Sequence, residues 1–190
     1  MRAGRGRIPI VVRRIKAGSA DLSSSGGCVH RGLKNDLGLT GIFEPIELNA
    51  ESDSLPEGRI AAAVFEGSID LDVDRYALSA KLLDYSSGGV IFEKIYRFKK
   101  GTCRSVAHHL SDEITYFLTG ETGVATTRIL FVRGSKGTKD LYIVDYDGHG
   151  ERKLTEGELV VSPLWLESGK FCYTSYKRGN PDCYMVDLRK

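Results

Sequence analysis

The sequence has 190 residues, of which 41% are hydrophobic and 27% charged, enough for one or two ordinary domains with a buried core. Its net charge of +2 is too small to favour nucleic acid or an anionic surface as a partner. No apolar run reaches the length of a membrane span, and the run Ile8–Val12 is too short for the core of a signal peptide. Composition therefore predicts a globular protein, with no export signal in the chain as given.

The first elements are a short strand and a helix. Ile8–Val12 predicts the strand, and a Gly/Ser-rich patch from Gly18 to Gly27 separates it from the helix. Apolar residues then recur every four positions and two glycines end the pattern: Val29, Leu33 and Leu37, followed by Gly38 and Gly41. This spacing predicts a helix with one apolar stripe turned toward a core.

Strands dominate the next fifty residues. Ile42–Leu48 predicts a strand, and the polar run Asn49–Gly58 predicts a loop. Arg59–Ile69 contains a compact apolar run, which is typical of a strand covered on both faces. Tyr76–Tyr85 and Val90–Lys99 alternate between apolar and polar residues around a turn, which predicts a hairpin.

A second helix is predicted over Cys103–Leu118. Thr102 is a candidate N-cap and Gly120 a candidate helix end. The apolar positions follow helical spacing: Val106, Leu110, Ile114 and Phe117. Residues 1–119 are therefore expected to form an α+β domain, a mixed sheet with two helices, and residues 120–126 to form a linker.

The remaining residues, 127–190, contain the same unit twice. At an offset of 42 residues, Ile129 aligns with Phe171, and the match continues without a gap to Asp145 and Asp187. Short alternating strands at such a period are typical of a β-propeller, in which each blade is a small antiparallel sheet. Only about one and a half blades fit, whereas propellers close with about four to eight. The expected fold is an α+β domain followed by an incomplete propeller.

Two clusters have the residue types of a metal site. On the second helix, His108 and Asp112, and likewise His109 and Glu113, are four residues apart. The two pairs point about 100° apart, so they do not converge on one ion and are interpreted as surface ion pairs.

A second metal-like pattern mimics a calcium loop. Asp145, Asp147, Gly150 and Glu156 stand at its first, third, sixth and twelfth positions. Strands flank the segment and His149 occupies the fifth position, so Asp147-Gly148 is interpreted as a hairpin turn.

The four cysteines show no C-x-x-C spacing and do not identify a compartment. If the last hairpin centres between Lys177 and Arg178, Cys172 and Cys183 oppose each other and a cross-strand disulfide is feasible. The alternative is that these two cysteines are small buried hydrophobic residues.

Nothing in the sequence indicates an active site. Trp165 and Tyr184 could serve a ligand, but blade aromatics usually fill the space between blades. Ser162 and Ser175 lack a converging histidine and acid, so no hydrolase triad is readable. The sequence predicts a protein that is not an enzyme and has no catalytic, cofactor or metal residues; partner-binding residues are not identified.

The chain resembles the TolB family, the propeller proteins of the Tol-Pal envelope system. In the N-terminal part the resemblance rests on residues 35–46 (NDLGLTGIFEPI), 107–114 (AHHLSDEI) and 118–123 (LTGETG). In the repeats it rests on residues 127–129 (TRI), 142–148 (YIVDYDG), 153–155 (KLT), 162–165 (SPLW), 173–175 (YTS) and 179–182 (GNPD). It implies a periplasmic, non-enzymatic scaffold that supports outer-membrane integrity and cell division and contacts the lipoprotein Pal through its propeller.

The sequence departs from this family at both ends. Only Met1–Arg7 precede the first strand, so the N-terminal segment with which the family contacts TolA is missing and TolA binding is not supported. Most of the propeller is also absent, which weakens the expected Pal contact and leaves an open edge through which the chain could self-associate. Two alternatives remain open: the propeller part of a prolyl-oligopeptidase-like hydrolase, and a cytoplasmic interaction module.

Overall fold

The chain divides into two compact units, Met1–Thr126 and Thr127–Lys190, called the N-terminal unit and the repeat unit. The computed structural model describes residues 6–48, 55, 59–135 and 137–189. Of the predicted loop Asn49–Gly58, all but Leu55 lies outside the described residues.

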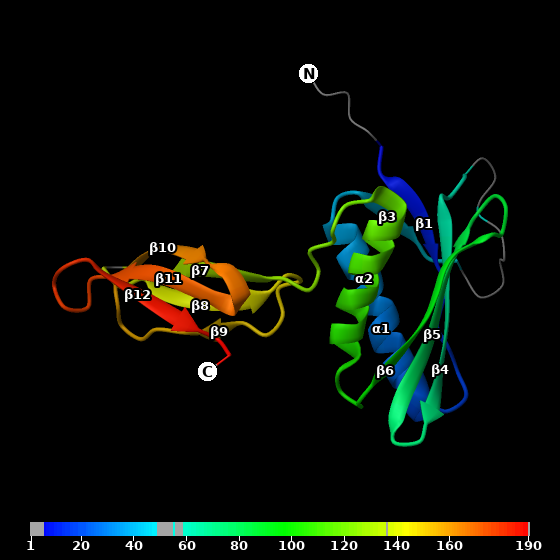
Figure 1. The fold of residues 1–190 in the computed structure, drawn as a ribbon, viewed down its shortest axis with the longest axis horizontal. Helices are drawn as coiled ribbons and strands as arrows, with labels where there is room; N and C mark the ends of the chain where they lie inside the picture. Colours follow the sequence, from blue (N-terminus) through cyan, green and yellow to red (C-terminus); the bar gives the residue numbers. More distant parts are fainter. Residues whose placement is uncertain (1–5, 49–54, 56–58, 136, 190) are drawn as a thin grey trace. The chain divides into compact units, whose positions relative to one another are not determined.

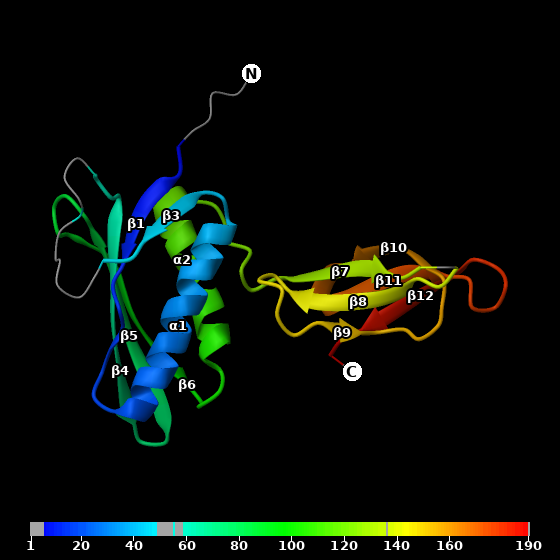
Figure 2. The ribbon, with the colours of Figure 1, turned by 180° about the vertical axis from the view of Figure 1, so that it is seen from behind.

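The N-terminal unit is a mixed sheet with two helices on one of its faces (Figures 1 and 2). The strands follow the order β3-β1-β4-β5-β6, with a short β2 beside β4. Their bounds are β1 Ile8–Val12, β2 Lys16–Ala17, β3 Phe43–Ile46, β4 Ala63–Asp72, β5 Arg75–Asp84 and β6 Val90–Phe98. β1 pairs in parallel with β3 and β4, whereas β4, β5 and β6 are antiparallel neighbours. The helices are α1, Ala20–Leu39, and α2, Cys103–Thr119. The predicted α+β domain is confirmed.

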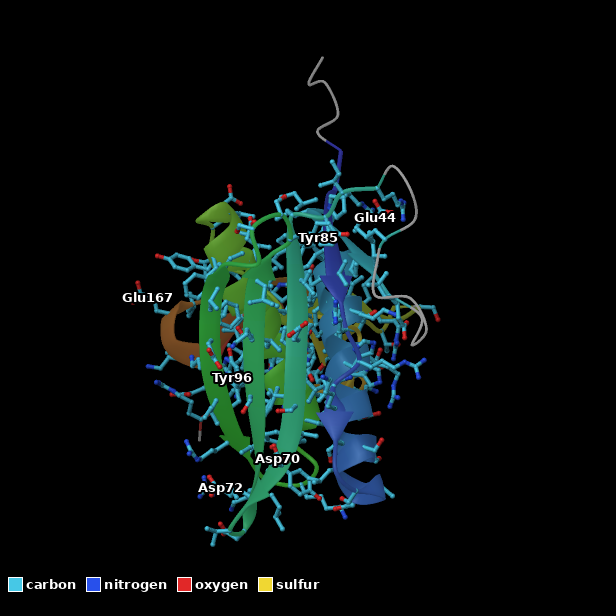
Figure 3. The ribbon with its side chains drawn as sticks, turned by 90° about the vertical axis from the view of Figure 1, so that its right-hand side faces the viewer. Glu44, Asp70, Asp72, Tyr85, Tyr96 and Glu167 are labelled. Carbon is cyan, nitrogen blue, oxygen red and sulfur yellow. A yellow bond between two sulfur atoms is a disulfide. The ribbon has the colours of Figure 1, made fainter. Side chains whose placement is uncertain are left out.

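The core lies between the sheet and the helices. Every second residue of β5 faces it: Tyr76, Leu78, Ala80 and Leu82 are all buried. A smaller cluster on the other face contains Val11, Leu55, Ala61 and Val64, so the start of β4 is covered on both sides, as predicted. Figure 3 looks onto this second face, with Asp70 and Asp72 labelled toward one end of the sheet and Tyr85 toward the other.

The Gly/Ser-rich patch does not separate the first strand from the helix, and that prediction is wrong. α1 begins within the patch, at Ala20, and the Ser19 hydroxyl oxygen accepts a hydrogen bond from the Leu22 N–H at 3.4 Å. A Cβ added at Gly26 would lie 3.2–3.3 Å from methyl groups of Ile15 and Ile69. Gly26 is therefore needed as a small residue because the helix lies close to the sheet at this point, which outweighs the poor helix propensity of glycine.

Both ends of α2 lie at the predicted cap residues, but only the C-terminal end has the predicted cap. Gly120 is left-handed, with φ 76°, and its N–H donates to the Tyr116 carbonyl at 2.8 Å, which confirms the helix end. Thr102 occupies the N-cap position, but its hydroxyl donates to the Lys99 carbonyl at 2.9 Å and makes no capping hydrogen bond.

The repeat unit consists of two three-stranded antiparallel sheets within residues 127–135 and 137–189. The first repeat sheet contains β7 Arg128–Arg133, β8 Asp140–Asp145 and β9 Arg152–Lys153. The second contains β10 Val160–Trp165, β11 Lys170–Ser175 and β12 Asp182–Asp187, with a short 3₁₀ turn, η1, at Glu167–Gly169.

The 42-residue repeat is reproduced in the pairing of the strands. Both ends of β7 and β8 become the ends of β11 and β12 when 42 is added to each residue number. The register is also the same, since Arg128 pairs with Asp145 and Lys170 with Asp187. The two hairpins are therefore copies of one structural unit.

The two repeat sheets pack face to face around a small core. Leu141, Val160 and Phe171 are fully buried there, and Tyr173 is 7% exposed. Partly buried residues from both sheets surround them, including Leu130, Val132, Trp165, Tyr184 and Val186. Each sheet thus gives one apolar face to the other.

Candidate interaction sites

The acids on α2 bind other elements rather than the histidines one turn away, so the predicted surface ion pairs do not form. His108 Nδ1 lies 2.7 Å from a carboxylate oxygen of the fully buried Asp36 on α1. Asp112 accepts the Ala125 N–H at 2.7 Å, and Glu113 accepts the Tyr96 hydroxyl at 2.5 Å. Burial and the neighbouring Glu113 raise the pKa of Tyr96. Each of the two acids therefore has a structural contact outside its own helix.

The segment with calcium-loop spacing forms a turn between β8 and β9. Gly148 has φ 84° and its N–H donates to the Asp145 carbonyl at 2.9 Å, while Asp147 accepts the His149 N–H at 3.1 Å. Glu156 pairs with Lys153 at 2.9 Å. The hairpin-turn interpretation is confirmed.

A disulfide joins the two helices of the N-terminal unit. Cys28 on α1 and Cys103, the first residue of α2, are bonded although they are 75 residues apart in the sequence. No spacing motif could have indicated this pair, because it depends on how the helices pack. A structural disulfide is typical of proteins in an oxidising compartment.

The pairing considered for Cys172 and Cys183 does not occur in the structure, where both are free thiols. Cys172 lies opposite Met185, and Cys183 opposite Thr174. The hairpin is centred one residue later than supposed, between Arg178 and Gly179, because Ser175 pairs with Asp182. Gly179 lies in this turn in the left-handed conformation, with φ 87°, which glycine adopts without steric cost. The pattern of apolar residues could not distinguish the two registers. Moving the centre of the hairpin by one residue shifts each partner by two positions, so both cysteines stay on the same face of the sheet in either case.

A groove of about 500 Å³ in the N-terminal unit gathers basic side chains around one acid. Its lining includes Arg14, His30, Arg31, Lys34 and Glu47. Glu47 accepts hydrogen bonds from Lys34 and, at 3.3 Å, from Arg14, and its other close neighbour is His30 Nε2 at 3.6 Å. The Lys34 ammonium lowers the pKa of Glu47. The anion held in this groove is therefore the chain's own carboxylate.

His30 is the buried member of this cluster. Its Nδ1 lies 3.2 Å from the Arg13 carbonyl, which can only accept, so Nδ1 carries the proton. Burial lowers the pKa of His30, against the opposing effect of Glu47. The cluster ties α1 to the segments that follow β1 and β3, which is a structural role.

The aromatic and serine candidates of the repeat unit also have structural positions. Trp165 packs edge-on against Phe171 at 5.8 Å, and Tyr184 stacks on Tyr173 at 5.5 Å, both within the second repeat sheet. Both rings also pack on the apolar cluster that the two sheets share, as predicted. The Ser175 hydroxyl donates to Glu158 at 2.6 Å. Ser162 has φ 52° where the pairing of β10 with β11 shifts register.

The comparisons with known proteins point to one family. A Tol-Pal system protein TolB of Nitrosomonas europaea is 31% identical over 204 residues, covering 97% of this chain and 45% of that protein. The corresponding protein of Legionella pneumophila strain Corby is 29% identical over 168 residues, covering 82% of this chain and 40% of that protein. This chain is a homologue of TolB. No protein-family model matches it.

The fold of this TolB homologue agrees with that relationship. The crystal structure of TolB from Acinetobacter baumannii superposes with a TM-score of 0.78 at 20% identity, covering 96% of this chain and 47% of that one. The chain thus spans less than half the length of the relatives it matches. In the described parts, neither α1 nor α2 is long and apolar enough to cross a membrane.

Proposed function

We propose that this TolB homologue is a non-enzymatic binding component of the Tol-Pal system, which supports outer-membrane integrity and cell division through protein–protein contacts. The observation that carries the proposal is that similarity to a Tol-Pal system protein extends over 97% of the chain. The aligned region therefore includes the junction between the α+β domain and the repeats. A binding role also fits the acids and histidines described above, whose bonds hold the fold together.

We infer that the two repeat sheets are blades of a β-propeller, preceded by a domain over residues 1–119 and a linker over residues 120–126. The identical register of the two hairpins supports the blades. The linker begins at the left-handed Gly120 and ends where Asp112 accepts hydrogen bonds from the N–H groups of Ala125, at 2.7 Å, and Thr126, at 3.1 Å.

The proposed partner is Pal, contacted through the propeller blades, and the proposed compartment is the periplasm. The names of the relatives support the partner, since they are Tol-Pal system proteins. The Cys28–Cys103 disulfide supports the compartment, because stable disulfides persist in oxidising environments and are rare in the cytosol. The same bond disfavours the cytoplasmic interaction module.

Calorimetric titration with the soluble part of Pal tests the proposal. The 190-residue chain is compared with a chimera that continues into the remaining repeats of the Nitrosomonas europaea relative. We expect the chimera to bind Pal and the shorter chain to bind more weakly, because part of the propeller surface is absent. If the chimera shows no heat of binding, the proposed function is wrong. An unrelated lipoprotein domain of similar charge is the control for non-specific association.

A further inference from the structure

Among the described residues that line the groove around Glu47, positive charge exceeds negative charge. Three cations, Arg14, Arg31 and Lys34, line it together with Glu47. Arg14 and Lys34 already contact that carboxylate, whereas Arg31 has no ion pair with any residue that the structure describes. The volume of about 500 Å³ is typical of sites for small molecules. The groove can therefore neutralise an anion other than its own carboxylate.

His30 adds an unused hydrogen-bond acceptor to the wall of this groove. Its side chain is 9% exposed and its Nε2 atom is buried. Since Nδ1 carries the proton, Nε2 can only accept a hydrogen bond in the neutral ring. The nearby Glu47 oxygen, 3.6 Å away, is also an acceptor, and no donor among the described residues bonds Nε2. Because a buried acceptor without a donor costs free energy, this position favours a group that has a hydrogen to donate.

The groove has room for its cations to turn toward a ligand. A Cβ added at Gly27 would lie 3.3 Å from a guanidinium nitrogen of Arg31, so the glycine leaves space for that guanidinium beside α1. Arg31 is exposed, and the Arg14 side chain is 78% exposed. All lining residues lie between Arg14 and Glu47 in the sequence, so the groove belongs to the N-terminal unit and does not depend on the repeats.

The Glu47 carboxylate is held only weakly in the groove. Its side chain is 34% exposed, and the Lys34 side chain that contacts it is 29% exposed. Ion pairs with this much access to water contribute little to stability, because the solvent screens them. Glu47 follows the last residue of β3, so its side chain can leave the groove while the strand stays paired. It neutralises cations but offers no hydrogen to His30.

We propose that this groove binds a phosphate group that carries a hydroxyl, as hydrogen phosphate or as a small hydroxylated phosphate monoester, and that Glu47 competes with this ligand for the cations. The phosphate oxygens accept hydrogen bonds from the guanidinium and ammonium groups, and the ligand O–H donates to His30 Nε2. The proposal does not rest on the Tol-Pal role.

Selectivity against sulfate follows from the buried acceptor. Sulfate resembles phosphate in size and charge, but it is fully deprotonated at neutral pH and has no hydrogen to donate. Binding sulfate would leave His30 Nε2 facing a second acceptor, as it now faces Glu47. General attraction by the cations would instead treat the two ions alike.

NMR titration of the full 190-residue chain, at constant ionic strength and about pH 7.5, where an ordinary histidine is neutral, tests the proposal. The probes are phosphate, glycerol 3-phosphate and sulfate. We expect shifts of the α1 amides near Gly27 and Arg31, and binding of at least one phosphate about tenfold tighter than that of sulfate. The tighter of the two phosphates identifies the source of the group. The chimera with the remaining repeats should bind with the same affinity.

Two variants test the charges of the groove. Arg31→Gln should weaken phosphate binding about tenfold, whereas Lys99→Gln, which removes an exposed cation elsewhere in the N-terminal unit, should not. Glu47→Ala should tighten phosphate binding about threefold, because the competing carboxylate is gone. Its matched control is Glu93→Ala, which removes an acid that pairs with a lysine at 3.2 Å outside this groove.

His30→Asn tests the acceptor. The shorter amide can still donate to the Arg13 carbonyl but has no atom at the position of Nε2, so the preference for phosphate over sulfate should disappear. Circular dichroism verifies that each variant folds, and the exposed Arg31→Gln keeps the test decisive if His30→Asn does not.

Equal affinity of the wild type for phosphate and sulfate overturns the proposal, as does a Glu47→Ala variant that binds phosphate no more tightly than the wild type. Amide shifts that are absent, or that lie outside α1 and the segments carrying Arg14 and Glu47, also overturn it. A chimera that no longer binds phosphate counts against it in the same way, because the lining does not include the repeats.

Discussion

Removing the Cys28–Cys103 disulfide should destabilise the N-terminal unit strongly. The bond links residues 75 apart, and the loop-entropy relation for a loop of that length gives about 4.5 kcal/mol at 25 °C. Since native disulfides typically contribute about 2–5 kcal/mol, Cys28→Ala combined with Cys103→Ala should lower the midpoint of thermal unfolding by about 10–20 °C.

The assay is hydrogen exchange of the full chain, followed at the buried strand β5, which reports the opening of the N-terminal unit separately from the repeat unit. The double variant should exchange faster than the wild type, and reductant should accelerate the wild type alone. Cys172→Ser with Cys183→Ser is the control and should behave as the wild type, because these thiols are free. If reductant exposes four thiols without changing exchange at β5, the cross-link does not stabilise the unit and the reasoning is refuted.

Three further predictions concern packing, pH and the repeat unit. Gly32→Val should lower the free energy of unfolding by about 2 kcal/mol, measured with urea, because an added Cβ would lie 2.8 Å from Ala107 of α2. Gly18→Ala is the control and should change this free energy little, because the space around Gly18 is open. The pKa of His30 is lowered by burial, so the unfolded state binds the proton more readily and stability should fall as the pH drops below about 6.5. His30→Gln should reduce this dependence; an unchanged pH profile would contradict it. Asp140→Asn should cost the repeat unit about 2 kcal/mol, because it removes the buried carboxylate oxygen that lies 3.0 Å from the Lys153 ammonium and can place an amide NH2 there instead. Asp182→Asn, the half-buried equivalent in the second repeat, should cost less in the same thermal assay.

The local elements were predictable from the sequence because their signals are local. Alternation and the 42-residue offset defined β7, β8, β11 and β12, since each strand exposes one side and buries the other. The apolar spacing and terminal glycine defined α2 in the same way. These patterns depend on neighbours along the chain, and they hold whichever way the elements pack.

The features that were missed depend on contacts between distant segments. Gly26 looked like a helix breaker until the closeness of Ile15 and Ile69 gave it a reason to be small. The Cys28–Cys103 bond requires that the start of α2 meet the middle of α1, which no spacing reveals. The partners of the acids on α2 likewise come from other elements. Each of these features depends on how distant segments pack against each other, and a single sequence contains little information about that packing.

Site-specific cross-linking in the periplasm tests whether this chain acts in the Tol-Pal system through its repeats. Photoreactive residues are placed at the exposed loop positions His149 and Arg178 in the repeat unit, and at the exposed Ser87 in the N-terminal unit as control. The chain is exported by an added signal sequence in cells that contain Pal. We expect a cross-linked species containing Pal from at least one repeat-unit position and none from Ser87. Cross-linking to Pal only from Ser87, or from no position while the chain is folded and exported, would contradict it.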